Sequence, residues 1–292
     1  MAKEATNVVK HRNHGTGYYV FIAFVMLVCI LLAVLSIIPF WIMIVNGTRS
    51  TPEIQAHAVS LLPSTHLMDN FKIINEKGSF NAFVGFRNSL IISTGATALA
   101  VYFSTLTAYA IVVYQWKLKR AFFTFIMAVM MIPAQVVTIG FYQMVYKVGL
   151  TNTFWPLILP SIAAPAMVFF MKQYMEPAFS LEIVQSARID GAGEFYTFNK
   201  IALPIMKPAM ATQAIFTFVS SWNNLFLPNV ILTKGNVKTM PIMVTMLKTD
   251  IYKVEYGSIY LGLTLTVLPL FIVYFLLSKY IIAGVALGSV KG

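Results

Sequence analysis

The chain has 292 residues, of which 58% are hydrophobic and only 11% are charged, and its formal net charge is +11. Soluble proteins carry about 25% charged residues, and with a mean hydropathy of +0.76 most of this chain must have lipid as its solvent. The composition excludes disordered, collagenous and disulfide-stapled classes, because Cys29 is the only cysteine and a lone thiol closes no internal bridge.

Six long runs without Asp, Glu, Lys or Arg follow one another along the chain, at residues 18–45, 88–114, 121–146, 154–171, 208–233 and 257–278. A bilayer core of about 30 Å requires about 20 helical residues. Strands of membrane barrels are about ten residues of strict alternation, whereas these runs are continuously apolar. The predicted fold is therefore an all-α membrane protein with six transmembrane helices, occupying residues 18–283.

Basic residues of short loops favour the cytoplasm, and two clusters of them flank the first two runs: Lys3, Lys10, Arg12, Lys117, Lys119 and Arg120. Both termini are therefore predicted to be cytoplasmic, as tails of residues 1–17 and 284–292. The same alternation places segment 46–87 outside and segment 172–207 inside. Because the remaining basic residues are scattered and form no single stripe, we interpret the net charge as a topology signal and expect no nucleic-acid partner.

The inner segment 172–207 is predicted to form a helix, a tight turn and a second helix. Leu181, Val184 and Arg188 follow helical spacing. Gly191 suits the position after a helix that requires a positive φ, and Asp190 either closes this turn or caps the next helix. Phe195, Phe198 and Ile201 return to helical spacing and predict the second helix. Pro204 is predicted to end this helix, and Pro208 to begin the fifth span.

Residues 185–192, followed by Phe198, Ile201, Leu203, Pro204 and Pro208, resemble the EAA loop of permease subunits of bacterial ABC importers. The resemblance implies a type I ABC importer permease fold in which this loop couples to an ATPase. The positions it assigns to coupling are Glu182, Gln185, Ser186, Ala187, Asp190, Gly191, Ala192, Phe198, Leu203 and Pro204. Gln185 and Ser186 stand where the family usually has glutamate and alanine, and Glu182 lies one turn earlier.

Three further segments, residues 39–49, 221–228 and 284–292, resemble the carbohydrate-importing subgroup of these permeases. The resemblance implies a carbohydrate substrate, a second permease subunit, two cytosolic ATPase subunits and an extracytoplasmic sugar-binding protein. It also implies a multi-pass protein of the bacterial cytoplasmic membrane, surrounded by membrane lipid. No catalytic residue, cofactor or metal is expected in the chain itself, because it lacks a G-x-x-x-x-G-K-[ST] loop and a Cys/His cluster with ligand spacing.

Polar and aromatic residues inside two runs are candidates for the substrate pathway: Gln135, Thr138 and Tyr142 in the third, and Trp222, Asn223, Asn224 and Phe226 in the fifth. An aromatic ring offers a face to a pyranose, and amides form hydrogen bonds with hydroxyls. One alternative is that these side chains only hold helices together in lipid, where such hydrogen bonds contribute about 0.6 kcal/mol on average. Another is that Asn223 and Asn224, about 15 residues into their run, form an outer gate.

Two other functions fit the composition. A self-contained secondary transporter usually has ion-coupling groups within its spans, and none of the six runs contains Asp, Glu, Lys, Arg or His, although carbonyls and hydroxyls alone can hold sodium. A membrane scaffold with no transport role would bind no ATPase.

Overall fold

The computed structural model describes residues 16–76, 80–248 and 254–289, and within these ranges all regular secondary structure is helical. Five helical stretches are long and apolar enough to cross a membrane: Thr16–Asn46, Ala82–Val113, Trp155–Ala178, Glu194–Trp222 and Tyr256–Leu276. The predicted all-α membrane fold is thus confirmed. The five stretches correspond to five of the six apolar runs.

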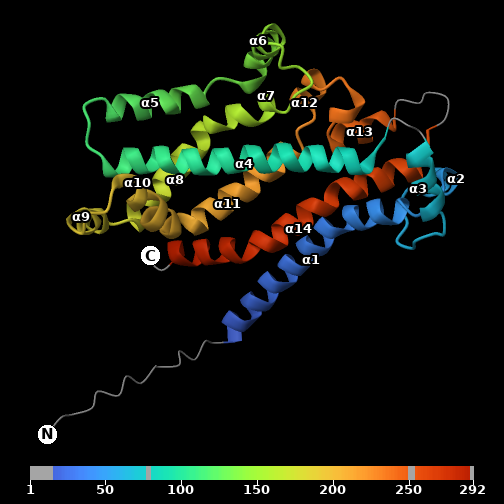
Figure 1. The fold of residues 1–292 in the computed structure, drawn as a ribbon. Coiled ribbons are helices and arrows are strands. Elements are labelled where there is room, and N and C mark those ends of the chain that lie inside the picture. The colour runs from blue at the N-terminus through green and yellow to red at the C-terminus, as the bar shows by residue number, and fades with distance from the viewer. Residues whose placement is uncertain (1–15, 77–79, 249–253, 290–292) are drawn as a thin grey trace.

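The sixth run, 121–146, is present as two shorter helices, so it differs from a single straight span. Helix α5 (Lys119–Met130) runs alongside α4 (Ala82–Val113), and α6 (Ala134–Lys147) then turns across the bundle (Figure 1). Pro133 stands at the break and caps α6 without a side-chain hydrogen bond. A proline cannot donate the backbone hydrogen bond that would continue α5, and this explains the interruption.

Helix α4 is the centre of the bundle. It packs against α8 (Pro165–Ala178) and α11 (Leu203–Trp222), and α11 packs in turn against α14 (Tyr256–Ser289). Ala100, Ala108 and Ala202 are almost fully buried together with Met171 and Met206. The small alanine side chains allow the helices to approach one another closely, and the methionines fill the gaps that remain between them.

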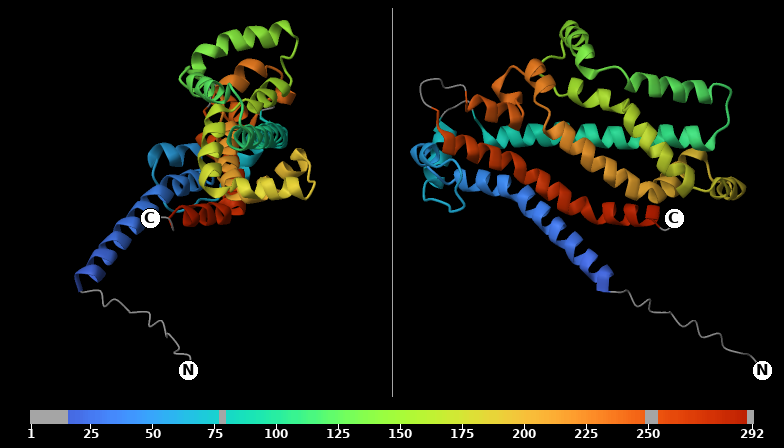
Figure 2. Two further views of the ribbon diagram at one scale, coloured as in Figure 1. Left: turned by 90° about the vertical axis from the view of Figure 1, so that its left-hand side faces the viewer. Right: turned by 180° about the vertical axis from the view of Figure 1, so that it is seen from behind.

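The C-terminal end of helix α1 (Thr16–Asn46) lies beside α14, and the N-terminal end of α1 diverges from the bundle (Figures 1 and 2). Most of its side chains are exposed, and its apolar window is not buried at all within the chain. The surface of α1 is therefore available to lipid or to another membrane subunit.

At the end of the bundle where α1 stops, α2 (Thr51–Ala56) and α3 (Leu67–Glu76) cover the first residues of α14. Ser50 and Glu53 form a reciprocal cap at the start of α2, and the backbone N–H of Ser50 lowers the pKa of Glu53. Buried Arg49 donates hydrogen bonds to Asn46 Oδ1 and to the carbonyls of Glu53 and His57, at 2.8–3.0 Å. These contacts explain how a short polar segment holds a fixed shape at the bundle end.

The same end contains three short elements between α11 and α14: α12 (Phe226–Ile231), the 3-10 turn η3 (Gly235–Val237) and α13 (Met240–Met246). Asn88 of α4 is buried and donates to the carbonyls of Asn236 and Lys238, both at 3.0 Å. The predicted fifth span, 208–233, is not one helix, because α11 ends at Trp222 and the chain bends before α12.

At the opposite end lie α9 (Leu181–Ile189), α10 (Glu194–Thr197) and the π-turn η2 (Phe198–Ala202), which leads directly into α11. The prediction that Pro204 ends a helix is wrong, because helical structure continues from Glu194 through Trp222. In η2 the N–H of Leu203 bonds the carbonyl of Phe198, five residues back. This wider turn precedes Pro204, which then occupies the first turn of α11, where a missing donor costs little. Pro208 consequently lies inside α11 and does not open it.

Candidate functional site

A cavity of about 980 Å³ lies between α4, the end of α5, α6, α8, α11 and α12, with the short elements α7 (Trp155–Ile158) and η1 (Leu159–Ile162) on one side. Its volume lies at the upper end of the range typical of small-molecule sites, about 300–1,000 Å³. The breaks between α5 and α6 and between α11 and α12 both occur at its wall. The irregular backbone therefore lines the cavity, as expected for non-helical segments at membrane depth.

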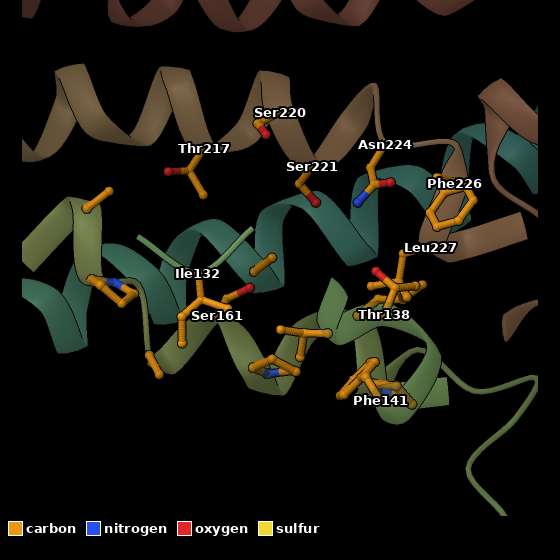
Figure 3. Close-up of a pocket in the computed structure, with 18 of the residues that line it drawn as sticks. Ile132, Thr138, Phe141, Ser161, Thr217, Ser220, Ser221, Asn224, Phe226 and Leu227 are labelled. Carbon is orange, nitrogen blue, oxygen red and sulfur yellow. The ribbon is translucent and has the colours of Figure 1, made fainter. Parts of the chain in front are cut away.

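Six polar side chains line this cavity: Thr138, Ser161, Thr217, Ser220, Ser221 and Asn224. Three of them come from the end of α11 and Asn224 from the bend that follows it, and these four lie opposite Thr138 and Ser161 (Figure 3). Phe141, Phe216 and Phe226 add aromatic surface. All six polar groups are neutral hydroxyls or an amide, which both donate and accept hydrogen bonds.

Three of the predicted pathway residues, Thr138, Asn224 and Phe226, line the cavity. Trp222 does not. Its side chain is 1% exposed, packs against Phe86 and Phe218, and donates from Nε1 to the carbonyl of Thr266 at 3.0 Å. The prediction that Trp222 faces the pathway is corrected to a packing position between α4, α11 and α14.

Of the remaining candidates in this group, Asn223 and Tyr142 do not line the cavity. Asn223 is exposed and ends α11 through a bond from its N–H to the carbonyl of Val219. Tyr142 packs with a neighbouring apolar cluster and against Tyr146. Gln135 falls in α6, but its side chain lies outside the described residues.

Ser161, Thr217, Ser220 and Ser221 were not predicted to be site residues. Thr217, Ser220, Ser221 and Asn224 follow a spacing of three, one and three residues, which in an unbroken helix would place them on one face. This polar stripe within an apolar run is the sequence signal that could have identified them.

A second site is the α9–α10 turn, residues 181–197, which projects from the end of the bundle (Figures 1 and 2). Ser180 caps α9 by accepting from the N–H of Glu182. Gly191 has a φ of +78°, as predicted, and the N–H of Ala192 bonds the carbonyl of Ala187 at 2.9 Å. This closure is the Schellman arrangement, in which glycine is favoured, and Asp190 ends α9 and does not cap α10.

The predicted coupling residues divide into an outer and an inner set. Those exposed on the turn and the following helix are Glu182, Gln185, Ser186, Asp190, Gly191 and Pro204, whereas Ala192 and Leu203 are half-buried and Ala187 and Phe198 are buried. The buried residues attach the turn to the bundle, because Phe198 packs on Tyr109 of α4. Ile189 and Phe195, with exposed fractions of 86% and 71%, add an apolar surface that we did not predict.

Three polar side chains meet at the base of the turn. Glu194 accepts a hydrogen bond from Arg188 Nε at 2.7 Å and another from the Tyr114 hydroxyl at 2.5 Å. The bond from Arg188, followed by that from Tyr114, lowers the pKa of Glu194. Burial, together with the neighbouring carboxylate, raises the pKa of Tyr114 to about 12. Tyr114 therefore stays protonated and donates throughout the physiological range.

Within the described residues, no group of three His, Cys, Asp or Glu side chains is arranged to hold a metal ion. The two sites that the structure defines are thus a neutral cavity within the bundle and a projecting turn at one end of it.

Comparison with known proteins identifies a family for the chain. Residues 100–286 match the family described as binding-protein-dependent transport system inner membrane component. An arabinooligosaccharides transport system permease protein of Halalkalibacterium halodurans is 35% identical over 266 residues, covering 89% of this chain and 93% of the relative. A lactose transport system permease protein of Rhizobium radiobacter is 32% identical over 265 residues, with the same coverage.

A solved structure of a bacterial ABC transporter involved in the import of the acidic polysaccharide alginate contains a chain with the same fold. The TM-score is 0.77 at 19% identity, over 92% of this chain and 99% of the other.

Proposed function

This chain belongs to the family of binding-protein-dependent transport system inner membrane components, and from that membership we propose that its cavity is part of a pathway for carbohydrate. The chain is a permease subunit of an ABC importer. Relatives are named for the transport of arabinooligosaccharides and of lactose, and the size of the cavity suits such molecules.

The carbohydrate is neutral. The polar lining consists of hydroxyls and one amide, and the runs 88–114, 121–146, 154–171 and 208–233, which supply almost all of the wall, contain no Asp, Glu, Lys, Arg or His. Neutral hydroxyls of a sugar exchange hydrogen bonds with such groups. A carboxylate or phosphate would lose its hydration without gaining a charged partner, which is costly.

The α9–α10 turn is the surface that docks on a cytosolic ATPase. Its exposed apolar side chains, Ile189 and Phe195, stand beside polar Gln185 and Asp190 on a fixed, closed turn. An exposed apolar patch with a polar rim is typical of a protein interface. ATP hydrolysis would take place on the ATPase subunits and not on this chain.

The complete importer would contain a second permease subunit, two ATPase subunits and an extracytoplasmic sugar-binding protein. In this arrangement the α9–α10 turn and both termini are cytoplasmic, and α2 and α3 are outside. Single cysteines at Ile189 and Leu62, which are 86% and 77% exposed, test the orientation once Cys29 has been replaced. Labelling of the Ile189 position by an impermeant maleimide from the outside would contradict it.

The decisive experiment reconstitutes the complete importer in liposomes and measures ATP hydrolysis and uptake with matched neutral and uronic-acid oligosaccharides. We expect uptake of a neutral member of the panel only. Failure of every sugar to stimulate hydrolysis or to enter would reject the carbohydrate assignment, and uptake of the acidic sugars alone would reject a neutral cargo.

A further inference from the structure

Three side chains form a closed triangle at the base of the α9–α10 turn: Arg188 and Glu194 of the turn, six residues apart, and Tyr114, which is 80 residues away from Glu194 in the sequence. Each carboxylate oxygen of Glu194 accepts from a different donor, one from Arg188 and one from Tyr114. The Arg188 guanidinium also lies over the Tyr114 ring, 5.7 Å from its centroid. Tyr114 is the residue that ends α4, so the triangle joins the turn to that helix.

The closed turn at Gly191 brings Arg188 and Glu194, two of the three side chains of this triangle, close together. It reverses the chain between the last turn of α9, which carries Arg188, and the first residue of α10, which is Glu194. Beneath the triangle, buried Val184 and Phe198 belong to the same apolar core as Tyr109 and Phe179. The turn is thus fastened to the bundle by packing on its inner side and by polar contacts at its edge.

Two connections therefore lead from the turn into the bundle. The covalent one passes through the π-turn η2 into α11. In a π-turn the regular hydrogen bonding of the helix gives way to wider bonds between residues five apart, and such bulges are places at which helices bend. The other connection is the contact of Glu194 with Tyr114, which reaches α4 without passing through η2.

We infer that Glu194, with Arg188 and Tyr114, positions the α9–α10 turn against α4, so that movement of the turn reaches α4 instead of being absorbed at η2. Helix α4 packs against both α8 and α11 and contributes Ala96 to the cavity wall. The triangle would therefore make substrate movement depend on ATPase movement. This inference rests on the proposed docking of the turn on an ATPase.

The triangle fixes the orientation of the α9–α10 turn more than it stabilises the folded chain. Arg188 and Glu194 have side-chain exposures of 43% and 46%, and exposed ion pairs contribute little to folding. Because the apolar contacts of Val184 and Phe198 remain in a variant, the loss of Glu194 should leave the complex assembled.

The test compares Glu194→Gln and Tyr114→Phe with Glu176→Gln, in the reconstituted importer. Glu176 accepts a hydrogen bond of 2.7 Å from Lys172 at the same end of the bundle, and both residues belong to α8, so Glu176→Gln breaks an ion pair within one helix while the contact of Lys172 with the Phe123 ring of α5 remains. The measured quantity is the number of neutral sugar molecules taken up per ATP hydrolysed, alongside co-purification of the ATPase. We expect this ratio to fall about threefold in Glu194→Gln and Tyr114→Phe, with wild-type co-purification, and to stay unchanged in Glu176→Gln.

Reversal of the pair supplies the second measurement. Arg188→Glu combined with Glu194→Arg should recover most of the lost ratio, because the Tyr114 hydroxyl can accept as well as donate. A wild-type ratio in Glu194→Gln would overturn the inference. So would a lowered ratio that the reversed pair does not restore, since the residues would then act by touching the ATPase directly. If the wild-type importer takes up no sugar or binds no ATPase, the proposed function fails instead.

Discussion

The indole Nε1 of Trp222 donates a hydrogen bond of 3.0 Å to the carbonyl oxygen of Thr266. This contact joins the last residue of α11 to the interior of α14, where Thr266 Oγ1 in turn bonds the carbonyl of Gly262 at 2.9 Å. The ring itself is enclosed by Phe86 and Phe218. Trp222 is therefore a packing residue whose polar group is satisfied within the bundle.

Trp222→Ala should lower the stability of the folded chain by about 3–5 kcal/mol, because it leaves a large buried cavity. Trp222→Phe retains most of the ring volume and should cost only the hydrogen bond, about 1 kcal/mol. Thermal unfolding of the detergent-purified chain, followed by size-exclusion chromatography, measures both. Equal stability of Trp222→Ala and wild type would contradict the packing role.

Asn224→Ala should reduce sugar uptake about tenfold, which corresponds to the loss of about 1.4 kcal/mol of interaction with the substrate. Asn223→Ala is the matched control, because the adjacent side chain is exposed but does not line the cavity. Uptake and the amount of assembled complex are measured on the same membranes. Equal uptake in the two variants would remove Asn224 from the proposed pathway.

Gly191→Val should strain the α9–α10 turn by about 1–3 kcal/mol, since a β-branched residue strongly disfavours a positive φ. No atom lies within 4 Å of a Cβ added at Gly191 or at Gly193, so crowding plays no part at either position. Gly193 has a φ of −68°, and Gly193→Ala should be tolerated. Co-purification of the ATPase and sugar-stimulated ATP hydrolysis are measured for both variants, and both quantities should fall in Gly191→Val but not in Gly193→Ala. Full stimulated hydrolysis in Gly191→Val would show that the turn need not keep its shape.

Gly257→Ala should disturb the end of the bundle at which α2 and α3 lie. A Cβ at Gly257 would collide with the carbonyl oxygen of Arg49 and with the side-chain amide of Asn70. The expected loss is about 1–3 kcal/mol, as for other overpacked sites. Gly140→Ala, with nothing within 4 Å of the added carbon, serves as the control in the same thermal assay. A wild-type unfolding temperature for Gly257→Ala would mean that α14 can move away from Arg49.

The contribution of Glu194 to stability should depend on pH. Its pKa is lowered below the ordinary value of 4.5 because Arg188 and Tyr114 donate to the carboxylate. The stabilisation is therefore complete above the unfolded-state pKa and is lost as the pH falls through the folded-state value. The difference in denaturation midpoint between wild type and Glu194→Gln, measured at several pH values, should shrink on acidification below 4.5. A difference that grows on acidification would contradict this sign.

The positions of the spans could be predicted from the sequence, because charged residues cannot enter lipid unpaired and so delimit the apolar runs. The breaks within those runs could not be predicted by that criterion, which counts only charges. Pro133 interrupts the third run, and the bend after Trp222 interrupts the fifth. At Pro204 a helix end was predicted where the helix in fact continues, because no residue pattern indicates that η2 accommodates the proline.

The shape of the α9–α10 turn was predicted well, because Gly191 imposes a local backbone geometry that does not depend on distant contacts. The cavity was predicted only in part. Trp222 is the last residue of α11 and Asn224 lies in the bend that follows, so the direction of each side chain depends on where the helix ends, and composition alone does not decide which of them faces the cavity. The contact between Tyr114 and Glu194 spans 80 residues and has no local signal at all.

The π-turn η2 also governs how length changes in this part of the chain can be tolerated. Each residue of an α-helix rotates the chain by about 100°, so deletion of one residue from Phe198–Ala202 would swing Arg188 and Glu194 away from Tyr114. A one-residue gap in an alignment at this point therefore corresponds to a reorientation of the α9–α10 turn relative to α11. Relatives that differ in length here would need an ATPase surface matched to a rotated turn, and exchange of ATPase subunits between such importers should fail even where every contact residue is identical.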